Sequence, residues 1–166
     1  MKIRIFMLMC ALILLGACAS YSENESTFEV GNVTLISNDV IHRPNTHFQG
    51  GAIMTEDGGF LQASGIPFVG WIRDNLSRIP TIQYSDDMRV VVQGQYGHIK
   101  NWSYPEHYDE IRIIYLSPED FLDGTADVSL PDEHGVYLLS VVVTWSGDDG
   151  SSGEFSTIIY VFKIEK

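Results

Sequence analysis

The chain has 166 residues, of which 22 are acidic and 10 are basic, and its formal net charge is −12 at pH 7. Nucleic acids and anionic lipid surfaces are bound through basic patches, so this charge balance excludes both as partners of the chain's own surface. The length is that of one domain and is sufficient to bury a single hydrophobic core. An acidic surface is typical of proteins that stay soluble after export.

The N-terminal segment has the pattern of an export signal. Residues 1–4 contain Lys2 and Arg4, and residues 5–15 form an uncharged run of mainly Leu, Ile, Met and Phe. A helix needs about 20 apolar residues to cross a bilayer, whereas an apolar run of about 7–15 residues behind a basic start is typical of a secretory signal peptide. A cytosolic helix would need a polar face, which this run lacks. We therefore expect export, with residues 1–17 as the signal peptide.

Cys18 stands where an export signal is normally cut. Residues 15–18 read Leu-Gly-Ala-Cys, which resembles the bacterial lipobox. The resemblance implies that the Cys18 thiol receives a diacylglycerol and that the chain is cut before it, which would anchor the protein on the outer side of a bacterial cell membrane. Ala17 and Ala19 also fit the small-x-small pattern of an ordinary signal peptidase site, with Ser20 as the new N-terminus. We favour the lipobox because it demands a cysteine at one position.

The cysteine count restricts the chemistry of the mature chain. Cys10 lies in the apolar run and leaves with it, while Cys18 carries the lipid. No thiol then remains for a cysteine nucleophile, a cysteine-ligated zinc or a disulfide. Residues 19–27 are polar and aperiodic, which predicts a flexible tether after the lipidated residues.

Residues 28–166 are predicted to form a single β-rich domain. The Val- and Ile-containing residues 28–37 predict a first strand. Residues 38–59 contain Pro44 and two Gly-Gly pairs, which predict a loop-rich segment.

One short helix is predicted, from Pro67 to Arg78. Proline suits the first position of a helix, and Pro80 ends this one. Apolar residues at three- and four-residue steps predict its buried face: Val69, Ile72, Leu76 and Ile79.

The second half of the chain predicts strands. They are expected at residues 88–93, 96–104, 111–116, 136–145 and 155–164, with an acidic or helical turn at 117–124. The last two strands alternate most clearly and are joined by a Gly-, Ser- and Asp-rich loop, which predicts a hairpin. Their apolar faces are Tyr137, Leu139, Val141, Val143 and Trp145 on the first strand and Ile158, Tyr160, Phe162 and Ile164 on the second. Such alternation with little helix predicts a β-sandwich.

Residues 130–137, Leu-Pro-Asp-Glu-His-Gly-Val-Tyr, resemble the tyrosine corner of immunoglobulin-like domains. The resemblance covers about residues 88–165 and implies that the Tyr137 hydroxyl bonds back to the corner backbone. It also makes Trp102 the candidate for the buried core tryptophan. The paired cysteines of antibody domains are absent, and the predicted helix departs from a plain sandwich. The same region loosely resembles the C-terminal halves of small lipoproteins of Gram-positive bacteria whose roles are unassigned.

The sequence contains none of the common catalytic nucleophile, zinc-protease and phosphate-binding motifs. We therefore predict a protein that is not an enzyme and that takes no cofactor or metal. The five histidines have no recognised zinc spacing: His42, His47, His98, His107 and His134. His107, beside Glu106, Asp109 and Glu110, is the best of them for a metal or pH-sensitive spot.

Two acidic loops raise the question of calcium. Asp148, Asp149 and Glu154 share the last hairpin loop, and Asp123 and Asp127 flank another turn. Calcium takes six to eight oxygen ligands, more than either loop evidently supplies, so calcium binding stays open.

The aromatic stretch at residues 96–108 is the predicted binding surface, with Tyr96, His98, Trp102, Tyr104 and Tyr108 as its candidates. Exposed Tyr and Trp are large, stiff side chains that anchor protein or glycan partners. The alternative is that one face of this stretch fills the core, Trp102 first. Lys100 lies on the same side and favours exposure of part of that face.

These observations lead to one favoured function and two alternatives. The favoured function is a lipid-anchored, non-catalytic interaction module for a protein, a peptide or a cell-wall component. The first alternative is an inhibitor or immunity-type protein that occupies a toxin or a peptidase. The second is an enzyme of unrecognised type.

Replacing the predicted lipid acceptor should change the fate of the whole protein. Cys18→Ser is expected to release the protein from the membrane or leave it unprocessed, because the acyl chains provide the anchor. Membrane fractionation and mass spectrometry of the mature N-terminus measure both effects. An unmodified N-terminus at Ser20 in the unchanged protein would contradict the lipobox assignment.

Overall fold

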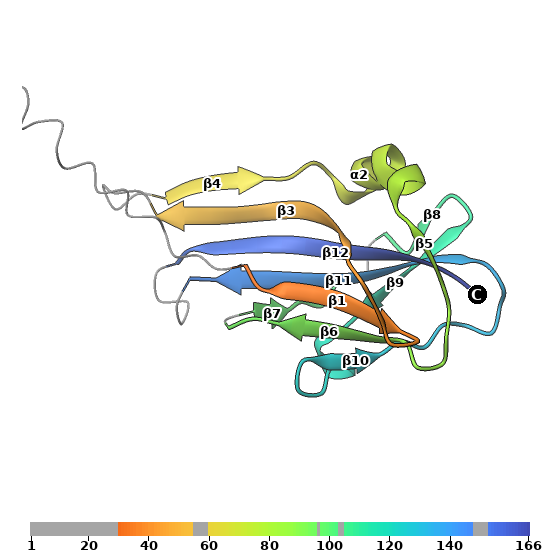
Figure 1. The fold of residues 1–166 in the computed structure, drawn as a ribbon. Coiled ribbons are helices and arrows are strands. Elements are labelled where there is room, and N and C mark those ends of the chain that lie inside the picture. Colours follow the sequence, from red (N-terminus) through yellow and green to blue (C-terminus); the bar gives the residue numbers. More distant parts are fainter. Residues whose placement is uncertain (1–29, 55–59, 96, 103–104, 148–152) are drawn as a thin grey trace, which may run out of the picture.

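The computed structural model describes residues 30–54, 60–95, 97–102, 105–147 and 153–166 (Figure 1). Two β-sheets face each other, and one short helix lies on the outer side of the larger sheet. Within these ranges, the predicted mainly β architecture with a single short helix is therefore confirmed. No helix in these ranges is long and apolar enough to cross a membrane.

The smaller sheet has four antiparallel strands in the order β10-β6-β1-β2. These strands are β1 (Asn32–Ser37), β2 (Val40–His42), β6 (Arg89–Gln93) and β10 (Thr125–Asp127). Alternate side chains of β1 and β6, among them Val33, Leu35 and Val90, are fully buried against the larger sheet. The smaller sheet therefore buries one face of the larger sheet.

The larger sheet runs in the order β4-β3-β12-β11-β9-β8, and β5 and β7 extend the pairing of β12 and β11. Its strands are β3 (Asn45–Met54), β4 (Phe60–Ser64), β5 (Thr81–Gln83), β7 (Gly97–Ile99), β8 (His107–Tyr108), β9 (Ile111–Leu116), β11 (Val136–Ser146) and β12 (Phe155–Glu165). Two of its pairs are parallel, β9 with β11 and β5 with β12. The remaining pairs are antiparallel.

The β11–β12 hairpin forms the middle of the larger sheet and separates two cores. The predicted apolar faces of both strands point toward the smaller sheet and form the inter-sheet core, as expected from their alternation. The intervening residues of β11, including Leu138 and Val142, point the other way. They form the outer core with Ile159 and Val161 of β12 and with the helix. A strand buried on both faces reads as a continuous apolar run, and β11 has that composition.

The helix lies where the sequence places it, but its buried face differs from the expected one. α2 (Phe68–Asn75) continues into the 3-10 turn η1 (Leu76–Arg78). Ile72 and Ile79 are buried as expected, whereas Val69 is 41% exposed. Phe68 is buried in its place, because it lies one turn before Ile72 on the same face of the helix.

The loop-rich prediction for residues 38–59 is wrong over most of its described part, since β2 and all of β3 lie there, while residues 55–59 lie outside the described residues. Gly50 and Gly51 lie inside β3 and do not break it. A Cβ on Gly51 would come within 2.6 Å of the Phe155 carbonyl oxygen, so the glycine permits a close approach to β12. The register of β3 and β12 also shifts between Thr157 and Ile158. The strand predicted at 96–104 is described as a strand only over β7.

Trp145, not Trp102, is the core tryptophan. Its side chain is fully buried in the inter-sheet core, and its indole N–H donates to the Tyr160 hydroxyl at 2.8 Å. The ring fits against backbone because three glycines surround it: Gly31, Gly94 and Gly97. Trp102 is half-buried on the opposite side of the sheet, against the outer core.

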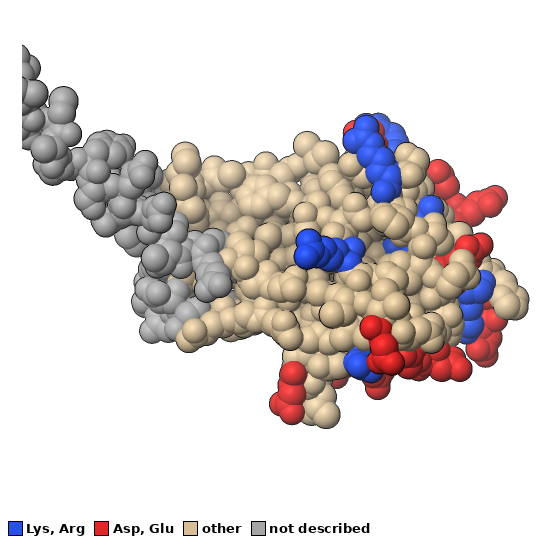
Figure 2. All heavy atoms as spheres, viewed as in Figure 1, with Lys and Arg blue, Asp and Glu red and all other residues tan. Residues whose placement is uncertain are grey.

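The described charged side chains are unevenly distributed. β3, β4 and β11 contain no Asp, Glu, Lys or Arg, and the charges of β12 lie near its end, at Lys163 and Glu165. On the face shown in Figure 2, the charged atoms gather mainly over the half of the domain away from the beginning of β1.

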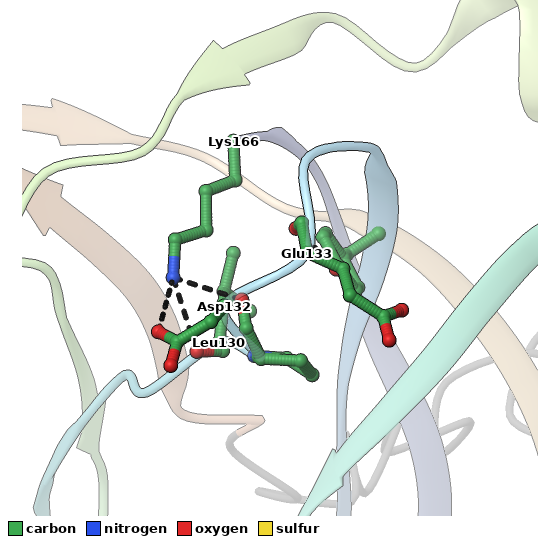
Figure 3. Close-up of polar contacts among 6 residues, drawn as sticks. Leu130, Asp132, Glu133 and Lys166 are labelled. Carbon is green, nitrogen blue, oxygen red and sulfur yellow. Dashed lines mark hydrogen bonds and ion pairs between the residues drawn. The ribbon is translucent and has the colours of Figure 1, made fainter.

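The tyrosine-corner hydrogen bond is present. The Tyr137 hydroxyl donates to the Glu133 carbonyl oxygen at 2.7 Å, as the resemblance implied. Lys166 ties the chain end to the same corner, with its Nζ 2.8 Å from the Pro131 carbonyl oxygen and 3.6 Å from Asp132 Oδ1 (Figure 3). The backbones of Lys166 and Gly135 also exchange two hydrogen bonds. The turn before β11 is thereby held to the end of β12.

Two glycine substitutions should shift stability in opposite directions. Gly97→Ala is expected to destabilise the fold by about 1–3 kcal/mol, because the new methyl group would overlap the buried Trp145 ring. Gly70→Ala should stabilise it by up to about 1 kcal/mol, since Gly70 lies inside α2 with open space around its Cβ position. Equilibrium urea unfolding measures both. A Gly97→Ala protein as stable as the unchanged one would contradict this packing.

Candidate functional site

The predicted binding residues that the structure describes do not form one cluster. His98 is exposed on β7, Tyr108 is half-buried on β8, and Trp102 is half-buried beyond the end of β7. Tyr96 and Tyr104 lie outside the described residues. Trp102 and Tyr108 both pack on the outer core, and His98 pairs with Thr144 of β11. Of the three that are described, Trp102 has the surroundings of a binding site.

Trp102 lines two hollows on the outer side of the larger sheet. The first has a volume of about 450 Å³ and is lined by Asn101, Trp102, Glu106, Ile113, Tyr115 and Ser117. The second, of about 330 Å³, lies over β3, β4 and β12. Besides Trp102 it is lined by Gln49, Gly50, Gly51, Gln62, Ala63, Ser64, Phe155 and Thr157. The paired glycines leave part of this surface without side chains.

Hydrogen bonds hold Trp102 in its orientation. Trp102 hydrogen-bonds to the Tyr115 hydroxyl, which in turn donates to the Pro105 carbonyl oxygen at 3.1 Å. Burial raises the pKa of Tyr115, while the bond from Trp102 acts in the opposite direction. The phenol therefore stays neutral and can accept from one neighbour and donate to the other at once. A Trp held in this way is pre-oriented for contact with a ligand.

An aromatic layer underlies the site and joins α2 to the sheet. The His47 ring lies 5.7 Å from the Phe68 ring and 5.4 Å from the Trp71 ring, measured between centroids. Phe68 also contacts Tyr115, at 6.5 Å. These spacings are those of favourable aromatic pairs. The helix thus supports the residue that orients Trp102.

His47 is buried in this layer, with 3% of its surface exposed. Burial lowers its pKa, and the nearby backbone of Ile66 and side chain of Gln49 oppose that shift. Even so, His47 Nε2 and Gln49 Oε1 meet no partner at hydrogen-bond geometry, and neither does Ser140 Oγ. Buried polar atoms without partners are uncommon in native folds. Gln49 also lines the second hollow, so it connects this layer with the surface.

The charge of the two hollows restricts what they can bind. Among their lining residues Glu106 is the one Asp, Glu, Lys or Arg side chain, and the other polar side chains are amides and hydroxyls. An anionic ligand would therefore find no cation there. The arrangement of an aromatic ring between neutral hydrogen-bonding groups is typical of small-ligand sites.

The histidines and acids are arranged differently from the expectation. His107 shares a hollow of about 210 Å³ with Glu110, its neighbour in sequence, and with Glu133 and His134. The sequence did not predict that His107 and His134 lie close together. Within the described residues, no group of three or more His, Cys, Asp or Glu side chains could hold a metal ion. Asp148 and Asp149 of the proposed calcium loop lie outside those residues.

Sequence reasoning missed most of the residues around Trp102. Gln49 lies in the segment that was predicted to be loop-rich, and Gln62 follows that segment. Tyr115 lies in a predicted apolar strand and had no feature that set it apart from its neighbours. Phe155, which is 39% exposed, is the first residue of β12, and the predicted apolar face of that strand did not include it. The aromatic stretch at residues 96–108 was the one sequence pattern that pointed to this site.

The buried histidine should make the protein acid-sensitive. In the unfolded chain His47 gains a proton as the pH falls below about 6.5, whereas in the fold its lowered pKa delays this. Its contribution to stability is therefore intact above that pH and is lost as the pH falls from about 6.5 toward the folded-state pKa. His47→Phe, which keeps a ring between Phe68 and Trp71, should show a shallower loss of unfolding free energy between pH 7 and pH 5. Equal slopes in urea unfolding would contradict this.

No protein-family model, no curated protein and no solved structure matches the chain. The candidate site is therefore supported by this chain's own residues and geometry. Trp102, its hydrogen-bonded support and the two hollows beside it are the features on which a function can be based.

Proposed function

We propose that the protein is an exported, lipid-anchored lipoprotein whose β-domain is a non-catalytic binding module. Its binding surface is the outer face around Trp102. The observation that carries this proposal is that Trp102 lines both hollows while Tyr115 holds its orientation. Rigid, partly buried aromatic side chains are the residues that dominate binding surfaces.

The membrane anchor in this proposal is the lipid on Cys18. The residues Leu-Gly-Ala-Cys at 15–18 support it, as does the apolar run before them. Eleven residues separate Cys18 from Val30, and such a segment spans at most about 40 Å. The domain would therefore work close to an extracytoplasmic membrane surface.

The immunoglobulin-like character of residues 88–165 is part of the proposal. The Tyr137–Glu133 hydrogen bond supports it. The parallel pairs β9–β11 and β5–β12 depart from the antiparallel sheets of that fold. Within residues 88–165, the corner before β11 and the β11–β12 hairpin are the parts that support it.

A second candidate function, an inhibitor or immunity-type protein, is favoured by the β3–β4 hairpin. β4 is the edge strand of the larger sheet and carries no charged residue. Leu61 on β4 and Ile53 on β3 are 59% and 46% exposed. Uncharged, apolar edge strands pair readily with another chain, such as a toxin or peptidase segment.

Chemical cross-linking on intact cells separates the two functions. Full-length protein, Trp102→Ala and Leu61→Ser are compared for the material attached to each. A binding module centred on Trp102 should lose its partner, whether protein or wall component, in Trp102→Ala and keep it in Leu61→Ser. The opposite result favours the inhibitor. A partner that both variants retain would contradict both assignments.

A further inference from the structure

We infer that the two hollows bind one neutral oligosaccharide chain that crosses Trp102. The inference rests on the proposed binding function of this face and adds the chemical class of the ligand. It is carried by three features of the described lining: its aromatic rings, its neutral hydrogen-bonding groups and its lack of cations.

The aromatic rings supply flat apolar surface at two points. Trp102 lines both hollows, and Phe155 lines the second. The C–H faces of sugar rings pack on such surfaces, whereas their hydroxyl groups remain at the edges. Because Tyr115 already binds the Trp102 side chain, the ring is positioned before any ligand arrives, which lowers the entropic cost of binding.

The remaining lining matches the hydroxyl groups of a sugar. Gln49, Gln62 and Asn101 carry amides, each of which both donates and accepts hydrogen bonds, and Thr157 adds a hydroxyl. Sugar hydroxyls also donate and accept, so the two sets are complementary. An apolar ligand would leave these groups without partners, at a cost for each.

Charge selects a neutral glycan over an acidic one. The described lining contains Glu106 but no Lys or Arg, and the chain as a whole has a formal charge of −12. Uronic acids, phosphates and sulfates would meet repulsion and no counter-charge. The ligand is therefore built from uncharged sugars.

The geometry favours a chain over a single sugar. The hollows of about 450 and 330 Å³ share Trp102 as a lining residue, so a ligand that fills both must contact it and extend beyond it. An extended peptide would instead pair with the β4 backbone and would depend little on Trp102. A linear saccharide uses both hollows and the ring that they share.

Calorimetric titration of the full-length protein tests the ligand class. The probes are linear hexasaccharides of β-linked glucose and of β-linked N-acetylglucosamine, with an oligogalacturonate as the acidic counterpart. At least one neutral probe should bind and the acidic one should not. Preference for the N-acetylated chain indicates a wall-type glycan as the source, and preference for the glucose chain indicates an external polysaccharide.

Variants locate the binding in the proposed site. Trp102→Ala should weaken binding at least about tenfold, and Trp102→Phe, which keeps a flat ring, should weaken it less. Gln62→Ala tests the second hollow from an exposed position that leaves the fold intact. Its matched control is Gln93→Ala, an exposed glutamine on β6 in the smaller sheet, which should leave affinity unchanged.

Two results would overturn the inference. One is that neither neutral probe binds at millimolar concentration. The other is that Gln62→Ala and both Trp102 variants bind as tightly as Gln93→Ala. If no sugar binds while Trp102→Ala still loses a cross-linked protein on cells, the glycan assignment fails and the binding function stands. If the Trp102-dependent cross-link is also absent, both fail.

Discussion

The pairing of β11 with β12 is the constraint on which the rest of the structure depends. Eleven residues of each strand face one another in continuous register, and β11 is buried on both of its faces. Because both faces of β11 are apolar, each must be buried against another element, and different segments of the chain provide these two elements. The smaller sheet covers the face with Tyr137 and Trp145, and α2 covers the face with Leu138 and Val142. The candidate site lies on the second side, at the part of the sheet that borders the helix-covered core.

The contrast between Trp145 and Trp102 shows how neighbouring backbone decides what a tryptophan does. Trp145 is enclosed because three glycines bring backbone against its ring, and Tyr160 accepts its N–H. Trp102 also has a phenol partner, Tyr115, but it lines two surface hollows. Both indoles are therefore held in one orientation by a tyrosine. The first holds the sheets together, and the second is available to a ligand.

Sequence reasoning succeeded where one physical signal dominated. The alternation at 136–145 and 155–164 identified the inter-sheet core because those strands bury one face of large side chains. Pro67 and Pro80 bounded the helix because proline restricts both its start and its end. It failed at β3, where the Gly50-Gly51 pair suggested a turn but instead permits a close approach between strands. Val69 was misplaced because periodicity gives the spacing of a helix face and leaves its rotation toward the core unspecified.

The amino-acid sequence by itself determined the β-rich class, the single helix, the long C-terminal hairpin and the corner at Tyr137, because each depends on residues that are neighbours along the chain. The proposed export and lipid anchor likewise rest on a local pattern, the residues that end at Cys18. The tertiary structure decided which tryptophan is buried and which residues share the hollows. Gln49, Gln62, Trp102 and Tyr115 come from separate strands and a connecting segment. Their proximity follows from strand order and register, and no local pattern encodes either.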